Sequence, residues 1–163
     1  MKAVSLSTLK KELNTLPHKD LLGLCIRLAK FKKENKEMIS YLVFEAGNEA
    51  EYIENVKAEL IVMFTEINRI HLYYTKKNIR KILRFLNKNI HYSGQKRTEI
   101  DLLIFFCQQL KASGIPIQKI TALQNLYQSQ IKKILKAVST LHEDLQFDYQ
   151  AEIKELTTFT SMS

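Results

Sequence analysis

The segment "DLLIFFCQQL", residues 101–110, decides the fold class, because its apolar side chains do not keep to one side of a helix. A helix that is apolar nearly all round is normally buried against several neighbours. Its purely apolar part, Leu102 to Cys107, is far too short to cross a bilayer, so we expect no stable membrane insertion. The segment therefore predicts a central helix that other helices surround.

Helical patterns continue on both sides of this segment, and no alternation typical of strands persists anywhere in the 163 residues. Only four glycines and two prolines interrupt the chain, so short turns should join the helices. The sequence predicts an all-α protein of about seven helices, as either an irregular bundle or a short αα superhelix. We expect one domain over residues 1–158, with 143–158 as an acidic helical appendage and 159–163 as a frayed tail.

Helix boundaries are marked by polar N-cap residues and by glycines that follow a helix. Gly47 suits a left-handed position just after a helix, because it has no Cβ. The first helix is expected to follow Ser7. N-caps are predicted at Asn35, Asn48, Thr75 and Thr98, and helix ends at Gly47, Gly94 and Gly114.

A heptad pattern runs through residues 127–145, where apolar residues step by four and three. They are Tyr127, Ile131, Ile134, Val138, Leu141 and Leu145, and Leu123, Leu126 and Leu135 widen the stripe. A widened stripe favours the core of a bundle over a two-stranded coiled coil. A homodimer through this seam is the alternative that the pattern leaves open.

The two cysteines, Cys25 and Cys107, lie far apart on helical segments, which does not indicate a disulfide framework. Both are expected as small apolar residues of the core. The first residues contain no apolar stretch of the kind that a signal peptide requires, so we expect a cytoplasmic protein.

The segment "LKKELNTLPHKDLLGLCIRLAKFKKENKEMISYL" lies within the first sixty or so residues. It resembles the N-terminal part of a bacterial domain family of unknown function. Members of that family begin with a short Leu/Lys/Glu helix, a turn, and a helix that starts near a Lys-Asp/Glu-Leu-Leu pattern. The resemblance covers about a third of the chain. It implies an all-helical bacterial protein without assigned chemistry, and it supplies no site residues.

The sequence contains no catalytic or metal-ligating pattern. The four histidines have no second His, Cys or carboxylate at a zinc-ligand spacing. Glu59 and Glu66 share a helical face, but at about 10 Å they are too far apart to share a proton. The chain also lacks a nucleophile elbow and a phosphate-binding glycine loop. We expect no enzyme, cofactor, metal or small-molecule ligand, and only an active site assembled from different helices stays open.

Basic residues concentrate in the middle of the chain. Residues 1–66 carry ten basic and ten acidic side chains, whereas residues 67–142 carry fourteen basic ones against two acids. Residues 143–163 are acidic, with a net charge of −4. This segregation favours an anionic partner.

Placed on a helix, residues 75–92 separate into an apolar face and a cationic ridge about 17 Å long. The ridge repeats like charges four residues apart without acids, and each such pair costs roughly a few tenths of a kcal/mol. Arginine guanidinium groups suit phosphates, and two aromatic residues beside the ridge, Phe85 and Tyr92, suit base stacking. The predicted anion-binding residues are Lys77, Arg80, Lys81, Arg84, Lys88, Lys96, Arg97, Lys132, Lys133 and Lys136.

These features favour a non-catalytic helical module that binds nucleic acid non-specifically through the ridge at residues 77–88. An acidic protein is a second candidate partner, and the acidic C-terminal segment could itself cover the ridge and gate it. Its acidic stripe consists of Asp144, Asp148, Glu152 and Glu155. The competing interpretation is a protein-interaction or homodimerisation module that uses the 127–145 seam, with the ridge merely solvated.

Overall fold

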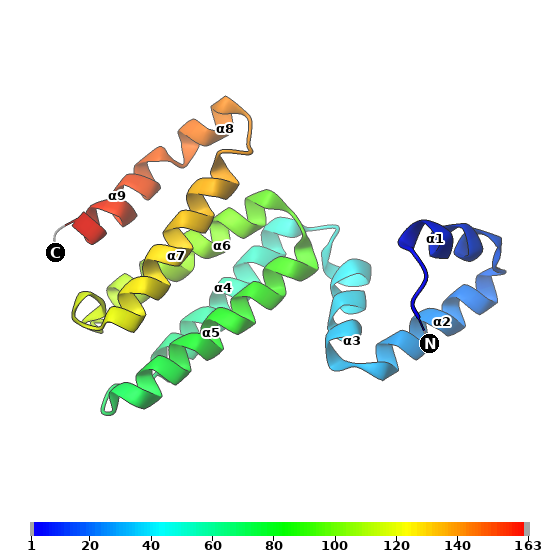
Figure 1. Ribbon diagram of the computed structural model, residues 1–163, viewed down its shortest axis with the longest axis horizontal. Coiled ribbons are helices and arrows are strands. Elements are labelled where there is room, and N and C mark those ends of the chain that lie inside the picture. Colours follow the sequence, from blue (N-terminus) through cyan, green and yellow to red (C-terminus); the bar gives the residue numbers. More distant parts are fainter. Residues whose placement is uncertain (1, 162–163) are drawn as a thin grey trace. The chain divides into compact units, whose positions relative to one another are not determined.

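The fold is all-α, as the sequence predicts (Figure 1). The computed structural model describes residues 2–161, which form nine α-helices, one π-helical turn and one 3-10 turn, without a strand. The count exceeds the seven or so expected, in part because a bend at Tyr149 divides the C-terminal segment into two helices. Within the same residues, no helix combines the length and the apolarity that a membrane span requires.

The chain separates into two compact units, Met1–Phe44 and Glu45–Ser163, which we call unit 1 and unit 2. The prediction of one domain over residues 1–158 stays a prediction. Unit 1 contains α1 (Leu6–Thr15), α2 (His18–Phe31) and α3 (Lys33–Ser40), and the π-helical turn Tyr41–Glu45 spans the boundary. Unit 2 contains α4 (Glu49–Thr65), α5 (Leu72–Ser93), α6 (Lys96–Ala112), the 3-10 turn Ile117–Lys119, α7 (Thr121–Val138), α8 (Glu143–Asp148) and α9 (Gln150–Ser161).

Unit 1 consists of short helices whose apolar side chains stay largely open to solvent. No residue of α1, α2 or α3 is buried, and the side chains of Leu22 and Phe31 are 54% and 76% exposed. α2 packs against α3, where the Asn35 amide donates a hydrogen bond to the Leu28 carbonyl at 2.9 Å. Unit 1 therefore holds its shape through local contacts rather than through a core.

Two helix starts predicted in unit 1 are wrong. Ser5, not Ser7, caps α1, because the Ser5 hydroxyl oxygen accepts a hydrogen bond from the Thr8 amide at 3.2 Å. Asn35 lies inside α3, and its side chain reaches back to α2 instead of the amides of its own helix. Short polar side chains can bond to whichever backbone group is nearest, so spacing along the sequence identifies a cap only approximately.

Glycines end helices at two of the three predicted positions. Gly94 and Gly114 have φ angles of 66° and 73°, in the left-handed region that favours glycine after a helix. Gly47 is not among the glycines with positive φ, so the predicted left-handed position there is wrong. It lies in the turn that precedes α4.

α6 is the central helix of unit 2, as its apolar sequence predicts. It contacts α4, α5, α7 and α9, and eight of its seventeen residues are buried. Phe106 of α6 packs at a tilt against Phe64 of α4, with 5.7 Å between the ring centroids. Each large apolar side chain removed from water contributes roughly 1.5–3 kcal/mol, so burial around α6 dominates the stability of unit 2.

α4 starts where the sequence predicts and packs along α6 and α5. The Asn48 side chain caps it by accepting a hydrogen bond from the Glu51 amide at 3.3 Å, and the helix ends at Thr65. The Tyr52 hydroxyl donates to the Asn89 carbonyl of α5 at 3.0 Å. The residues of α4 that face the core are Tyr52, Val56, Leu60 and Phe64.

The two remaining predicted N-caps are wrong, because both threonines lie inside their helices and their hydroxyls donate to groups outside the cap. α5 begins three residues before Thr75, whose hydroxyl donates to the Asn68 carbonyl at 2.7 Å. Thr98 lies in the first turn of α6 and donates to the Glu49 carboxylate of α4 at 2.6 Å. Ser93, the last residue of α5, donates to the same carboxylate oxygen. Glu49 therefore joins three helices.

The heptad seam packs inside unit 2. α7 ends at Val138, so Leu141 and Leu145 lie beyond the helix, and Leu135 is 45% exposed on the other side. A homodimer through this seam stays a prediction. The buried residues of the predicted stripe are Leu123, Tyr127, Ile131, Ile134 and Val138.

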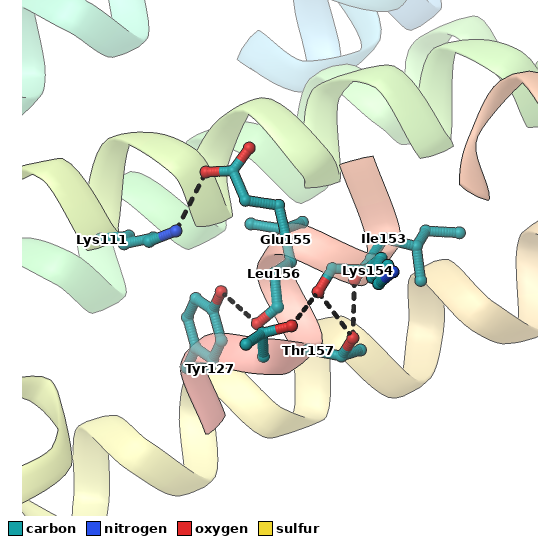
Figure 2. Close-up of polar contacts among 8 residues, drawn as sticks. Lys111, Tyr127, Ile153, Lys154, Glu155, Leu156 and Thr157 are labelled. Atoms are coloured by element: carbon teal, nitrogen blue, oxygen red, sulfur yellow. Dashed lines mark hydrogen bonds and ion pairs between the residues drawn. The ribbon is translucent and has the colours of Figure 1, made fainter. Parts of the chain in front are cut away.

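The C-terminal helix α9 packs on α6 and α7 (Figure 2). The buried Tyr127 hydroxyl donates to the Leu156 carbonyl at 3.1 Å, and the Lys111 ammonium donates to the Glu155 carboxylate at 3.0 Å. The frayed tail predicted at 159–163 overlaps the end of α9, and its last two residues lie outside the described part of the chain.

The two cysteines differ sharply in their surroundings. Cys107 is buried on α6 as predicted, and burial raises the pKa of its thiol from 9.0 to about 12. Cys25 is exposed on α2, so its predicted place in a core is wrong. The difference follows from the absence of buried residues in α2.

Candidate functional site

The predicted cationic ridge lies on α5, which carries six lysines and arginines and no acid. Burial of Ile79, Ile82 and Leu86 turns the opposite face of the helix outward. Within residues 45–161, no carboxylate lies within ion-pair distance of the exposed ridge cations. These exposed cations are Lys77, Arg80, Lys81 and Arg84.

A hollow follows one flank of α5. The α5 residues that line this hollow recur every three or four positions, so they form one face of the helix, about 20 Å long at ~1.5 Å per residue. Two ridge residues, Lys81 and the half-buried Lys88, are not among them. The lining residues are Tyr73, Lys76, Lys77, Arg80, Leu83, Arg84 and Asn87.

A second hollow of about 300 Å³ lies where α5, α6 and α7 meet. α5 contributes Asn87 and Ile90, and α7 contributes Lys133 and Lys136. Asn87 lines both hollows, so the flank of α5 continues directly into the α7 lysines. We call this continuous surface the basic track, and its cations are Lys76, Lys77, Arg80, Arg84, Lys133 and Lys136.

One acid, Glu99, lines the second hollow, and it is paired with a predicted site residue. The Lys96 ammonium lies 2.7 Å from the Glu99 carboxylate, so this pair adds little net charge to the hollow. The uncompensated charge comes from Lys133 and Lys136. Cations lining a concave surface reinforce one another's potential, which raises the local concentration of anions.

Besides Lys81 and Lys88, two more predicted site residues lie off the basic track. Lys132 is exposed on α7 but does not line either hollow. Arg97 lies beside Tyr149, whose hydroxyl donates to Asp101 at 2.7 Å. Burial and then Asp101 raise the pKa of Tyr149 to about 12, against the opposing effect of Arg97. Arg97 therefore belongs to the contact between α6 and the C-terminal segment.

The two aromatic residues predicted to stack on bases lie in different surroundings. Tyr92 is 7% exposed, and the Lys88 ammonium lies 6.0 Å from its ring centroid, so no ring face is open to a base. Phe85 is half-buried. The exposed aromatic residue of the site is Tyr73, at 67% exposure. Sequence reasoning missed it because the helix was expected to begin at Thr75, which placed Tyr73 outside the face of α5.

The acidic C-terminal stripe does not cover the ridge. α9 contacts α7 and α6, and Glu155 pairs with Lys111 of α6 rather than with a cation of α5 (Figure 2). The predicted autoinhibitory arrangement is therefore wrong for this structure. Packing of Tyr149 and Leu156 decides where the stripe lies, because these apolar side chains must face the core.

Within residues 2–161, no three His, Cys, Asp or Glu side chains gather where they could hold a metal ion. The site thus offers fixed positive charge, an exposed tyrosine and an amide, which suit binding of an anion. Comparison of the chain with protein-family models, curated proteins and solved structures found no match.

Proposed function

We propose that unit 2 binds the phosphate backbone of a nucleic acid, without sequence specificity, through the basic track. The observation that carries this proposal is the continuity of the track. Cations from α5 and α7, more than forty positions apart in sequence, line two hollows that share Asn87. A merely solvated face would not require this convergence.

The type of side chain also supports a phosphate ligand. Arg80 and Arg84 present planar guanidinium groups that can each donate two parallel hydrogen bonds to a phosphate. Lys77, Lys133 and Lys136 supply point charges at neighbouring places along the track. Among residues 45–161 these groups have no carboxylate partner, which leaves them available to an anion. Phosphate contacts of this kind position a nucleic acid but do not read its bases.

The test is fluorescence anisotropy with a labelled 20-nucleotide homopolymer, measured between 50 and 200 mM salt. If about five phosphates are contacted, affinity should fall by about 10²–10³-fold over this range, because each contact releases counterions. The double variant Arg80→Glu, Arg84→Glu should weaken binding at least about tenfold at the lower salt concentration.

The matched control is Lys119→Glu, Lys154→Glu, which changes the net charge by the same amount at two exposed positions of unit 2 off the track. We expect the control to retain most of the affinity. Equal losses in the two variants would mean that net charge alone drives the interaction. Absence of salt-dependent binding by the unmodified protein would contradict the proposal outright.

A further inference from the structure

The N-terminal end of α5 carries a cluster of aromatic rings beside the basic track. Tyr73 and Tyr74 meet edge to face, with 5.3 Å between ring centroids and an interplanar angle of 80°. His71 approaches Tyr74 in the same manner, at 6.2 Å and 64°. Such edge contacts hold a ring in position without covering it as a core would.

Tyr73 is the member of this cluster that lines the hollow on α5. Its side chain is 67% exposed, while Tyr74 is 49% exposed and does not line the hollow. On the helix, Lys77 and Arg80 follow Tyr73 by one and two turns, about 6 and 10 Å further along at ~1.5 Å per residue. The accessible ring therefore lies in line with the phosphate-binding cations, at one end of the track.

An exposed aromatic ring at that place can stack on the bases of a single strand but not on those of a duplex. In a duplex, the faces of the bases are stacked on one another, so a duplex offers the track its phosphates but no open base face. In a single strand, an unstacked base can lie flat on a tyrosine ring while its neighbouring phosphates contact the cations. The binding energy gained by stacking is largely independent of base identity, because every base has an aromatic face.

We infer that the basic track binds single-stranded nucleic acid in preference to duplex, with Tyr73 as a stacking platform for a base. This inference rests on the proposed function and adds the class of ligand to it. Tyr73 supplies the preference, whereas Arg80 and Arg84 supply affinity for either form. The inferred stacking residue is therefore Tyr73 at the start of α5, whereas the sequence favours Phe85 and Tyr92.

The experiment compares two labelled probes at one salt concentration, a 20-nucleotide oligo-dT and a DNA hairpin of matched phosphate number. The unmodified protein should bind the single strand at least about tenfold more tightly. Tyr73→Ala should weaken binding of the single strand by about 5- to 150-fold, equivalent to ~1–3 kcal/mol, and change binding of the hairpin less than about twofold. Tyr73→Phe should retain the preference, because the ring is kept.

The control is Phe147→Ala, which removes another exposed aromatic ring, 70% exposed on α8, outside the track. It should leave both affinities unchanged. Loss of single-strand binding in Tyr73→Ala with an unchanged salt dependence would support stacking, since the substitution removes no charge. If Tyr73→Ala binds both probes as the unmodified protein does, while Arg80→Glu, Arg84→Glu binds neither, the inference is wrong and the proposed function stands. If the unmodified protein binds neither probe, both are wrong.

Discussion

The two units show what helix-forming sequence achieves with and without burial. In unit 1, α1 to α3 form with local hydrogen bonds and one side-chain cap, Ser5 on α1, yet no residue of these helices is buried. In unit 2, α6 alone buries eight side chains against four other helices. Isolated helices of ten to fourteen residues are only marginally stable in water, so we expect unit 2 to provide most of the free energy of folding. The difference shows that the spacing of apolar residues is enough to form a helix. Whether the apolar side chains are buried depends on the other helices that pack against it.

The largest expected contrast is in thiol reactivity. Cys25 of unit 1 should react with a thiol reagent at the rate of an accessible cysteine. Cys107 should react at least about 10³-fold more slowly at neutral pH, because it is buried and reaches the reagent only when unit 2 opens. A colorimetric time course with and without denaturant measures both rates. Cys25→Ser should remove only the fast phase, and a fast phase that persists in this variant would mean that Cys107 is accessible.

The next contrast compares one phenylalanine from each unit. Phe106→Ala should lower the free energy of unfolding by about 3–5 kcal/mol, because the substitution leaves a cavity against Phe64 in the core of unit 2. Phe31→Ala should change it by less than about 0.5 kcal/mol, because the side chain is 76% exposed. Urea unfolding followed by circular dichroism measures both values. A cost of several kcal/mol for Phe31→Ala would show that unit 1 buries this side chain in solution.

The smallest contrast concerns two glutamates at helix N-termini. Glu49→Ala should cost about 2–3 kcal/mol, because the Ser93 and Thr98 hydroxyls lose the carboxylate that joins α4, α5 and α6. Glu34→Ala, in the first turn of α3, should cost only about 0.3–1 kcal/mol through the helix dipole. Thermal unfolding of the two variants under identical conditions provides the comparison. Similar costs would indicate that Glu49 acts only through the helix dipole.

Much of the fold can be predicted from the sequence alone, because the spacing of apolar residues and the residue composition both indicate helices. The all-round apolar character of residues 101–110 predicts the central position of α6, and Asn48, Gly94 and Gly114 mark helix boundaries correctly. Thr75 and Thr98 do not cap their helices, because a threonine hydroxyl can bond to a cap amide or to a group outside its own helix. In the folded chain, these groups are the Asn68 carbonyl for Thr75 and the Glu49 carboxylate for Thr98.

The candidate site was predictable in part, for a related reason. The outward face of α5 follows from the burial of its isoleucines, which the amphipathic pattern already indicates. Which distant cations join that face depends on which α7 residues line the hollow shared with α5 and α6, and these are Lys133 and Lys136 but not Lys132. The place of Arg97 depends in the same way on the C-terminal segment.

By itself, the sequence determined the all-α class, the central helix and the cationic face of α5, since each depends on residues within one helix. The tertiary structure decided which of these faces meet, where the acidic stripe lies and which tyrosine stays open. The physical reason is that helix formation depends on neighbours three and four residues apart, while burial and the surface potential depend on contacts between helices. Asn87, where the two hollows meet, is therefore inconspicuous in the sequence and central to the proposed site.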